Sequence, residues 1–596
     1  MKKFNPKFVF KPVFLPVFFL IIVSIVCFLL EAPSYKKYTA ICSTLLKEEL
    51  SMDSLSLHFT LSNPEKYHIS SSQVVLPSLK KEDRVQQNAR LEEHLDSLSR
   101  LKTKTWTLPQ QISHEILLSS MKGSLTGEEF VYFYEPFSSS HGIQSEYPML
   151  LFEYAFRREE DIKQYLKLLE LTPDYFESMV EFEKERLAQG YIFSESNATS
   201  AIDACDNFAS ARDAFLTTFQ KRMDPLIGQN VISPETAKSY ESCNERIVDT
   251  IVLPAFTKLG DEILLLKQHG VEEKSLYHKS GGKEYYSYLL QESVGTDKNV
   301  SQLKTLLLQN LKNNLEEFQQ LLTTKEFDAS SMIQDPLTKM SPGEMMEDIK
   351  MRMKNDFELN ESNSYPYEIQ TVDSCLEPYT APAYYFTPPL DTLDENHIYI
   401  NEQQTADGVH LYTTLAHEGF PGHLYQAVTS QNAFINNQLP LLRGVLGYGG
   451  FVEGYATYAE LSSYEYAKEC AKNLGTDADS LFDVYYYDRQ IKLCLYSLLD
   501  IMIHGEGKNL GEVTAFLSDF GIQDDSAANA IYQYILNEPT TYLKYYVGYL
   551  EILECKQLAI DNWGSDYSHK NFHKYLLEIG PAPFSIIKKA IRQYGG

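Results

Sequence analysis

Two histidines, a neighbouring glutamate and a later glutamate form a pattern that suits metal-assisted hydrolysis. Residues 417–423 have the sequence His-Glu-Gly-Phe-Pro-Gly-His, and Glu453 follows thirty residues after His423. A catalytic zinc ion takes three protein ligands and keeps a fourth position for water, and a free carboxylate beside the ion accepts the proton of that water. We therefore predict a Zn²⁺ site with His417, His423 and Glu453 as ligands and Glu418 as the general base.

The spacing of the two histidines differs from the usual helical pair, in which two histidines four residues apart share one face. Here the second histidine lies six residues on, about 240° around an ideal helix. Pro421 and Gly422 favour an interruption, because proline lacks an amide hydrogen and glycine tolerates unusual dihedral angles. We expect a bulge or break over residues 419–422 that turns His423 back toward His417. Without a metal, His417 would cap or pack a helix and His423 would be an ordinary surface residue.

Two motifs resemble those of the DUF885 family, His-Glu-x-x-Pro-Gly-His and Glu-Gly-Trp-Ala-x-Tyr-Ala-Glu. The first matches in full at residues 417–423, and the second matches at residues 453–460 except that Tyr455 replaces the tryptophan. Further resemblances lie at residues 383–389, 500–504 and 545–551, so the likeness covers most of the chain after residue 40. The resemblance implies a mainly α, zincin-like metal-dependent hydrolase related to carboxypeptidase-type metallopeptidases.

Glu460 competes with Glu453 for the place of third ligand. The two residues are seven positions apart, so they lie on nearly the same face of a helix, two turns from each other. Glu453 follows the Gly-Tyr-Gly-Gly segment at 447–450, which allows a helix to begin close against another backbone. We assign Glu453 as the ligand and Glu460 as the acceptor of a hydrogen bond from a ligand imidazole. An exposed position on an ordinary helix explains Glu460 equally well.

Four other residues are candidates for supporting roles. The oxyanion of a hydrolytic reaction needs a donor besides the metal. Tyr545 is the first candidate because it matches the tyrosine of the family's Tyr-x-x-Gly segment, and His504 is the second. Arg489 and Asp500 would orient the substrate or support the ligands, although a structural salt bridge explains both as well.

A short strand is expected at residues 396–401, where apolar and polar residues alternate. The free edge of such a strand can pair with an extended peptide, and a small structural hairpin is the alternative. If the edge binds substrate, Tyr384, Tyr385 and Phe386 would line side-chain pockets, and Tyr399 on the strand is a further candidate.

Length and composition indicate one compact catalytic unit over residues 31–596 with two helical lobes. The resemblance to zincin-like hydrolases implies that these lobes surround a deep active-site cleft with a small β element. No Gly/Ser-rich or Pro-rich linker interrupts the 596 residues, and 43% of them are hydrophobic. Helices are expected to begin at Pro342, after a Ser341 capping box, and near Thr172. The net charge of −28 argues against nucleic acid as a partner.

The amino terminus predicts a membrane segment. Four lysines in residues 1–11 precede an uncharged apolar run of 19 residues at 12–30. That length is close to the ~20 residues that span a bilayer, and a basic flank stays on the cytoplasmic side. We expect a single-pass anchor in the cell membrane with the catalytic domain outside, and a secreted enzyme after signal cleavage is the alternative.

Together these observations favour an extracytoplasmic zinc-dependent metallopeptidase that acts on short peptides. Its expected partners are a peptide substrate and, through the N-terminal segment, the membrane; the sequence does not indicate an oligomeric state. Two other classes stay open: a zinc-dependent hydrolase of a non-peptide amide or ester, and a catalytically inactive membrane-anchored binding protein on the same scaffold.

Overall fold

The computed structural model is mainly helical and describes residues 33–70, 73–324, 335–359, 365–374, 376–406 and 408–594. The mainly α fold class is thereby confirmed. Within these ranges, no helix has both the length and the apolar character that crossing a membrane would require. The predicted basic flank (1–11) and anchor or signal segment (12–30) lie outside the described residues.

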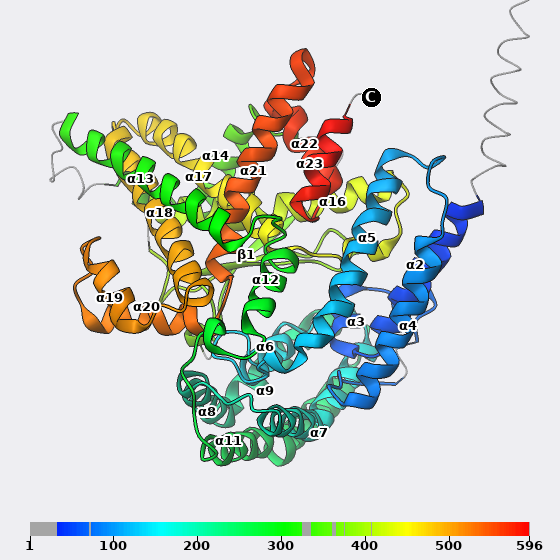
Figure 1. Cartoon of the computed structure of the whole chain (residues 1–596). Coiled ribbons are helices and arrows are strands. Elements are labelled where there is room, and N and C mark those ends of the chain that lie inside the picture. The colour runs from blue at the N-terminus through cyan, green and yellow to red at the C-terminus, as the bar shows by residue number, and fades with distance from the viewer. Residues whose placement is uncertain are drawn as a thin grey trace, which may run out of the picture.

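The amino-terminal half consists mainly of helices (Figure 1). In chain order they are α2 (Pro33–Leu50), α3 (Ser54–Thr60), α4 (Lys81–Ser99), α5 (Leu108–Gly127), α6 (Ile143–Glu153), α7 (Glu159–Ala188), α8 (Glu195–Ala209), α9 (Arg212–Gly228), α10 (Pro234–Ile247), α11 (Leu253–Lys267), α12 (Gly282–Glu292) and α13 (Val300–Thr324).

The carboxy-terminal half begins with one helix, continues with a small sheet and ends with a second set of helices. Its elements are α14 (Pro342–Met353), β1 (Tyr367–Thr371), β2 (Ala383–Phe386), β3 (Asn396–Ile400), α15 (Val409–Glu418), α16 (His423–Asn436), α17 (Gly449–Asn473), α18 (Asp479–Asp500), α19 (Leu510–Ser518), α20 (Asp525–Asn537), α21 (Thr541–Trp563), α22 (His569–Ile579) and α23 (Phe584–Gln593).

One of the two predicted helix starts is correct. The hydroxyl of Ser341 accepts a hydrogen bond from the amide of Glu344, whose carboxylate accepts one in return, and α14 begins at Pro342. The start near Thr172 is wrong, because α7 begins at Glu159 and continues through Pro173. The hydroxyl of Thr172 contacts the buried hydroxyl of Tyr147 at 2.9 Å instead of capping a helix. Tertiary packing thus outweighs the local signal of proline.

The sheet lies between two hydrophobic cores. β3 is its central strand, parallel to β1 and antiparallel to β2. Because successive side chains of a strand point to opposite faces, Ile398 belongs to the core formed mainly by α12–α23, whereas Tyr399 belongs to the core formed by α6–α11. The expectation of a free edge on the 396–401 strand is therefore wrong. The two edge strands are β1 and β2, and β2 is the one whose backbone contacts the end of α15, through the amide of Tyr385 and Glu418.

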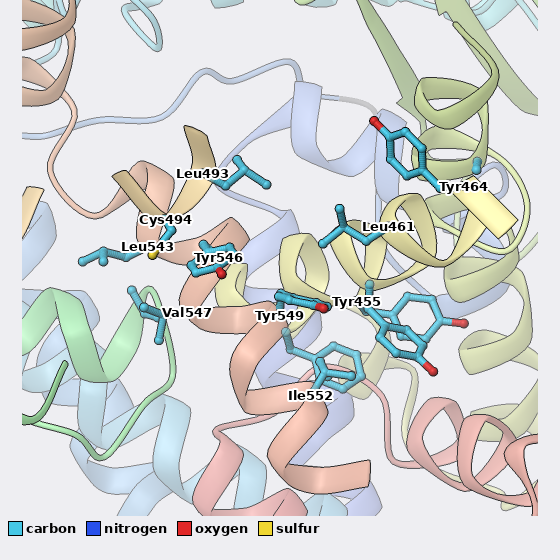
Figure 2. Close-up of a cluster of buried hydrophobic side chains, with 14 of the residues drawn as sticks. Tyr455, Leu461, Tyr464, Leu493, Cys494, Leu543, Tyr546, Val547, Tyr549 and Ile552 are labelled. Carbon is cyan, nitrogen blue, oxygen red and sulfur yellow. The ribbon is translucent and has the colours of Figure 1, made fainter. Parts of the chain in front are cut away.

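Helices α17, α18 and α21 pack closely in the larger core (Figure 2). Tyr455 of α17 and Tyr546 of α21 are fully buried there. A Cβ atom on Gly454 would lie 2.3 Å from the backbone carbon of Gly548, so these two helices touch backbone to backbone. At the start of α17, a Cβ on Gly450 would lie 2.0 Å from the carbonyl oxygen of Val294, which confirms the predicted close approach. The contact places Glu453 beside the α21 segment that carries Tyr545.

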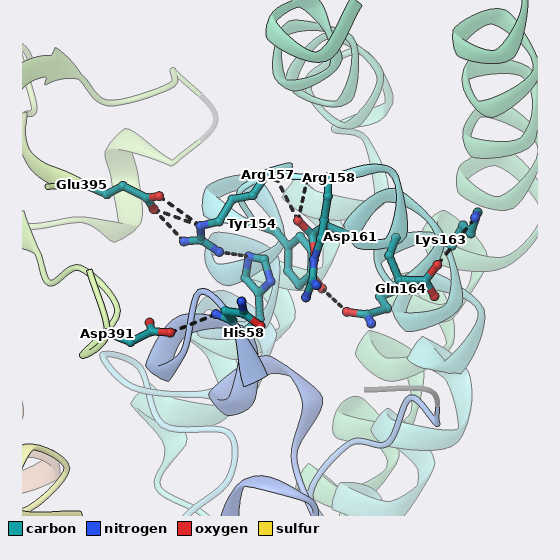
Figure 3. Close-up of polar contacts among 11 residues, drawn as sticks. His58, Tyr154, Arg157, Arg158, Asp161, Lys163, Gln164, Asp391 and Glu395 are labelled. Carbon is teal, nitrogen blue, oxygen red and sulfur yellow. Dashed lines mark hydrogen bonds and ion pairs between the residues drawn. The ribbon is translucent and has the colours of Figure 1, made fainter. Parts of the chain in front are cut away.

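The connection between β2 and β3 is tied to the amino-terminal helices by polar contacts (Figure 3). Arg157 forms an ion pair with Glu395 at 2.7 Å and donates a hydrogen bond to Nε2 of His58 at 3.3 Å. Asp391 accepts the backbone amide of Ser62 at 2.6 Å. Burial and the charge of Arg157 lower the pKa of His58, so its ring is a neutral acceptor. The β2–β3 connection is thus held at two points, by Arg157 at Glu395 and by the backbone of Ser62 at Asp391.

Candidate metal centre

The break between α15 and α16 brings the two histidines of the first motif together. α15 ends at Glu418 and α16 begins at His423, and residues 419–422 are not helical, as predicted. The amide of Gly422 donates to the carbonyl oxygen of Ala416 at 3.0 Å. A Cβ on Gly422 would lie 1.8 Å from the carbonyl oxygen of His417, so the chain folds back through a space that admits only glycine.

Glu453 lies between the two imidazoles. Its Oε2 atom is 3.5 Å from Nε2 of His417 and 3.6 Å from Nε2 of His423. Two ligand atoms that are each ~2.1 Å from a tetrahedral zinc ion are about 3.4 Å apart. The same oxygen is buried and has no hydrogen-bond partner among the described residues. The donor set of two imidazoles and one carboxylate therefore fits Zn²⁺ in chemistry and in spacing.

Glu418 also lies close, since one ligand atom from each of His417, Glu418 and His423 falls within 4.8 Å of the others. It differs from Glu453 in its hydrogen bonding, because its Oε2 accepts the backbone amide of Tyr385 at 2.8 Å. One oxygen of Glu418 is thus held by β2, whereas Oε2 of Glu453 has no hydrogen-bond partner among the described residues and faces both imidazoles. This difference favours Glu453 as the ligand and leaves Glu418 as an oriented carboxylate beside the site.

The charges in the cluster favour a cation. Burial raises the pKa of Glu418. Burial alone would also raise the pKa of Glu453, but His423 and His417 hold it well below its usual range. Burial opposes the charge of His417, yet Glu453 and Glu460 raise its pKa to about 10. Three carboxylates therefore surround two imidazoles, and the field that keeps His417 protonated would equally attract a divalent ion.

Glu460 contacts the imidazole of His417, in the place predicted from the sequence. Its Oε2 lies 3.1 Å from Nδ1 of His417, and Arg489 donates to its two oxygens at 2.6 Å and 3.2 Å. Burial opposes the charge of Glu460, but Arg489 and His417 lower its pKa to about 2. The carboxylate thus stays ionised and accepts a hydrogen bond from Nδ1 of His417, which directs Nε2 of the same ring toward Glu453.

Tyr545 lies beside the cluster. Its ring is stacked at 6.0 Å from that of His417. Burial and the neighbouring carboxylates Glu453 and Glu418 hold the pKa of Tyr545 well above its usual value. Its hydroxyl therefore keeps its proton and can donate a hydrogen bond.

The structure does not bring His504 and Asp500 to the cluster. His504 donates from Nε2 to the carbonyl oxygen of Ile535 at 2.9 Å and accepts the amide of Leu276 at Nδ1. Asp500 accepts the hydroxyl of Tyr286 at 2.5 Å and the amide of Thr540, directly before α21, at 2.7 Å. Both residues connect helical segments of the core. The sequence predicts a supporting role at the site for both, because a buried structural histidine or aspartate looks the same there as a catalytic one.

The three proposed substrate-binding tyrosines lie on opposite faces of the sheet. Tyr384 and Tyr399 stack on each other at 5.0 Å on the face of the amino-terminal core, and Tyr399 donates a hydrogen bond to Glu153. Tyr385 lies on the face of the cluster, where its hydroxyl donates to Asn396 at 2.6 Å. Alternation along β2 therefore places only Tyr385 beside the candidate metal centre.

Sequence reasoning missed a cavity of about 370 Å³ that adjoins the cluster. His423 and Glu453 form part of its wall, and Gln426 and Ser430 of α16 form another part. A signal was present, because Gln426 and Ser430 lie three and seven residues after His423 and therefore share its side of α16.

The fold and this cluster define a mainly helical protein with a candidate metal centre. The chain belongs to the DUF885 family, described as "Bacterial protein of unknown function", whose model matches residues 68–591. No curated protein matches the chain.

Two solved structures share its fold. One is a "putative lipoprotein" from Colwellia psychrerythraea, with 16% identity over 94% of this chain and 99% of that one and a TM-score of 0.81. The other, a "putative lipoprotein of unknown function" from Shewanella oneidensis, has 17% identity over 92% of this chain and 98% of that one and a TM-score of 0.60.

Proposed function

We propose that the protein is a zinc-dependent metallopeptidase that hydrolyses short peptides. The observation that carries the proposal is the position of Glu453 Oε2. This atom is buried, has no hydrogen-bond partner in the described structure and lies 3.5–3.6 Å from the Nε2 atoms of His417 and His423. These three residues would hold Zn²⁺. When bound, the ion would acidify a water molecule and polarise the carbonyl group of the substrate.

The residues of the chain supply the remaining steps. Glu418 takes the proton of the attacking water and passes it to the leaving amine, and its raised pKa suits a group that must both accept and donate. The amide of Tyr385 keeps the carboxylate oriented. The hydroxyl of Tyr545 donates to the oxygen on which negative charge develops. Glu460 and Arg489 hold His417 in the required tautomer.

We further propose a zincin-like arrangement in which two helical lobes enclose the active-site cleft. The two cores on opposite faces of the sheet support it. The β2 edge that reaches Glu418 would be the place where an extended peptide lies.

The location proposed for the catalytic unit is outside the cytoplasmic membrane, either anchored or secreted. Residues 1–30 support this, because a basic flank precedes an apolar run of nearly spanning length. The two solved structures that share the fold are each described as a "putative lipoprotein", which agrees with this location.

The test is hydrolysis of a mixed short-peptide library by the purified protein, with zinc content measured on the same samples. Glu418→Gln should retain about one zinc ion per chain and lose activity by roughly 10²-fold or more. Glu465→Gln, on the exposed side of α17, is the matched control. A zinc-loaded wild type that cleaves no peptide would redirect the proposal to another amide or an ester, and a protein without zinc affinity would refute the site.

A further inference from the structure

The cavity beside the cluster is bounded by two of the candidate ligands, by a mainly apolar surface and by a few polar side chains. His423 and Glu453 lie at its wall together with Leu393, Phe434 and Val452. A group that enters it from the cluster therefore leaves water for a mainly hydrophobic surface. Its volume of about 370 Å³ is sufficient for a large amino-acid side chain and is at the lower end of the range for small-molecule sites.

The cavity carries little charge. Among the described residues that line it, Glu453 and His423 are the only acidic or basic side chains, and both belong to the candidate metal centre. A charged substrate side chain would lose its hydration there without finding a partner of opposite charge. The lining thus selects against lysine, arginine, aspartate and glutamate.

Two buried polar atoms on α16 lack partners. Gln426 and Ser430 are each 4% exposed, and neither Nε2 of Gln426 nor Oγ of Ser430 has a hydrogen-bond partner in the described part of the chain. Both residues line the cavity on the side of α16 that carries His423. Gln431, on the same helix, differs because its Nε2 donates to the carbonyl oxygen of Leu390 at 3.1 Å. Buried polar groups are nearly always paired, so these two point to a bound partner.

The wall formed by the β2–β3 connection is fixed in place. The amide of Leu390 donates to the carbonyl oxygen of Thr60 at 2.9 Å, and the contacts of Asp391 and Glu395 hold the rest of the β2–β3 connection (Figure 3). The shape of the cavity is therefore set by the fold, which limits the ordering needed on binding.

We propose that this cavity binds the side chain of a substrate residue next to the scissile bond, and that it selects a large uncharged side chain with a hydroxyl at its end, as in tyrosine. The ring would contact Phe434 and the aliphatic wall. The hydroxyl both donates and accepts, so it would pair with the carboxamide of Gln426 and the hydroxyl of Ser430. This assignment rests on the proposed peptidase function and names its substrate class.

The test uses zinc-loaded Glu418→Gln protein and alanine-based hexapeptides that carry Tyr, Phe, Lys or Glu at the third or fourth position, with binding measured by calorimetry. At the preferred position, the Tyr peptide should bind about 3- to 10-fold more tightly than the Phe peptide, the effect of one or two hydrogen bonds. The Lys and Glu peptides should bind at least about 10-fold more weakly than the Phe peptide. Adding Gln426→Leu and Ser430→Ala should make Tyr and Phe equal, whereas Asn436→Ala, exposed at the end of the same helix, should change nothing.

Equal binding of the Tyr and Phe peptides before these changes, a Tyr preference that survives them, or no binding of any peptide would each overturn the assignment. Ser430→Ala alone, which removes a single oxygen, repeats the test if the double change prevents folding. Failure of the proposed function gives a different result, because wild type would then cleave none of the peptides while the Tyr preference in binding persisted.

Discussion

Nδ1 of His417 lies 3.1 Å from Oε2 of Glu460, so the second motif supports the first across the interface between α15 and α17. The contact settles which nitrogen of the imidazole faces Glu453. Arg489 of α18 holds the same carboxylate at 2.6 Å. Three helices therefore determine the direction of one candidate ligand.

Glu460→Gln should weaken zinc binding by about 10- to 100-fold, because the amide holds the imidazole less firmly and lowers its basicity. Competition with a chelator at fixed pH measures the dissociation constant. Glu465→Gln, on the same helix but exposed, should leave the constant unchanged. An unaltered affinity in Glu460→Gln would mean that His417 does not ligate the ion or does not depend on this contact.

Tyr545→Phe should lower kcat by about 10²- to 10³-fold and leave the zinc content at the wild-type level, since the hydroxyl acts on charge that develops in the transition state. Steady-state kinetics on a cleaved library peptide separates kcat from KM. Tyr542→Phe, one turn earlier in α21, is the control. If only KM rises in Tyr545→Phe, the hydroxyl binds substrate and does not stabilise the oxyanion.

Gly548→Ala should separate α17 from α21. The added Cβ would lie 2.1 Å from the carbonyl oxygen of Gly450 and 2.9 Å from Cα of Gly454, and backbone atoms cannot rotate away. We expect a loss of about 1–3 kcal/mol in the free energy of unfolding and weaker zinc binding, because Glu453 moves with α17. Urea denaturation and chelator competition measure the two effects.

Gly343→Ala is the matched control for that change, because a Cβ at Gly343 meets no atom within 4 Å and its backbone is helical. It should be neutral or slightly stabilising. A Gly548→Ala protein as stable as wild type would show that the two helices can separate without cost.

The positions of site residues could be predicted from the sequence where they depend only on local backbone geometry. Pro421 and Gly422 indicate a break whatever surrounds them, and the seven-residue spacing of Glu453 and Glu460 places both carboxylates on one side of a helix. The backbone contact at Gly422 then determines how the chain folds back.

Features that depend on partners distant in sequence could not be predicted. The 396–400 strand has the same alternation whether it is central or at an edge, and only the pairing of β1 with β3 decides this. His504 is distinguished from a catalytic histidine by contacts with Leu276 and Ile535, more than 30 residues away on either side. Pro173 lies within α7 because the helix packs against a core that local propensity does not describe.

The burial of His504 should make the stability of the folded protein depend on pH in the acid range. It is 1% exposed, and burial lowers its pKa to about 4 from 6.5. Between pH 6.5 and pH 4 the unfolded chain binds a proton at His504 and the folded protein does not. The free energy of unfolding is therefore unaffected by His504 above pH 6.5 and decreases progressively as the pH falls from 6.5 to 4. The total decrease that corresponds to this pKa difference is roughly 3 kcal/mol.

His504→Gln should remove this part of the acid dependence, because a carboxamide can donate to Ile535 and accept from Leu276 without titrating. The free energy of unfolding should therefore fall less between pH 7 and pH 4.5 in the variant than in wild type. Urea denaturation at the two pH values measures the difference. His573 and His58, whose pKa values burial also lowers, contribute equally to both proteins and cancel. The exposed His269→Gln is the control, and parallel pH profiles for His504→Gln and wild type would show that His504 titrates normally in the folded protein.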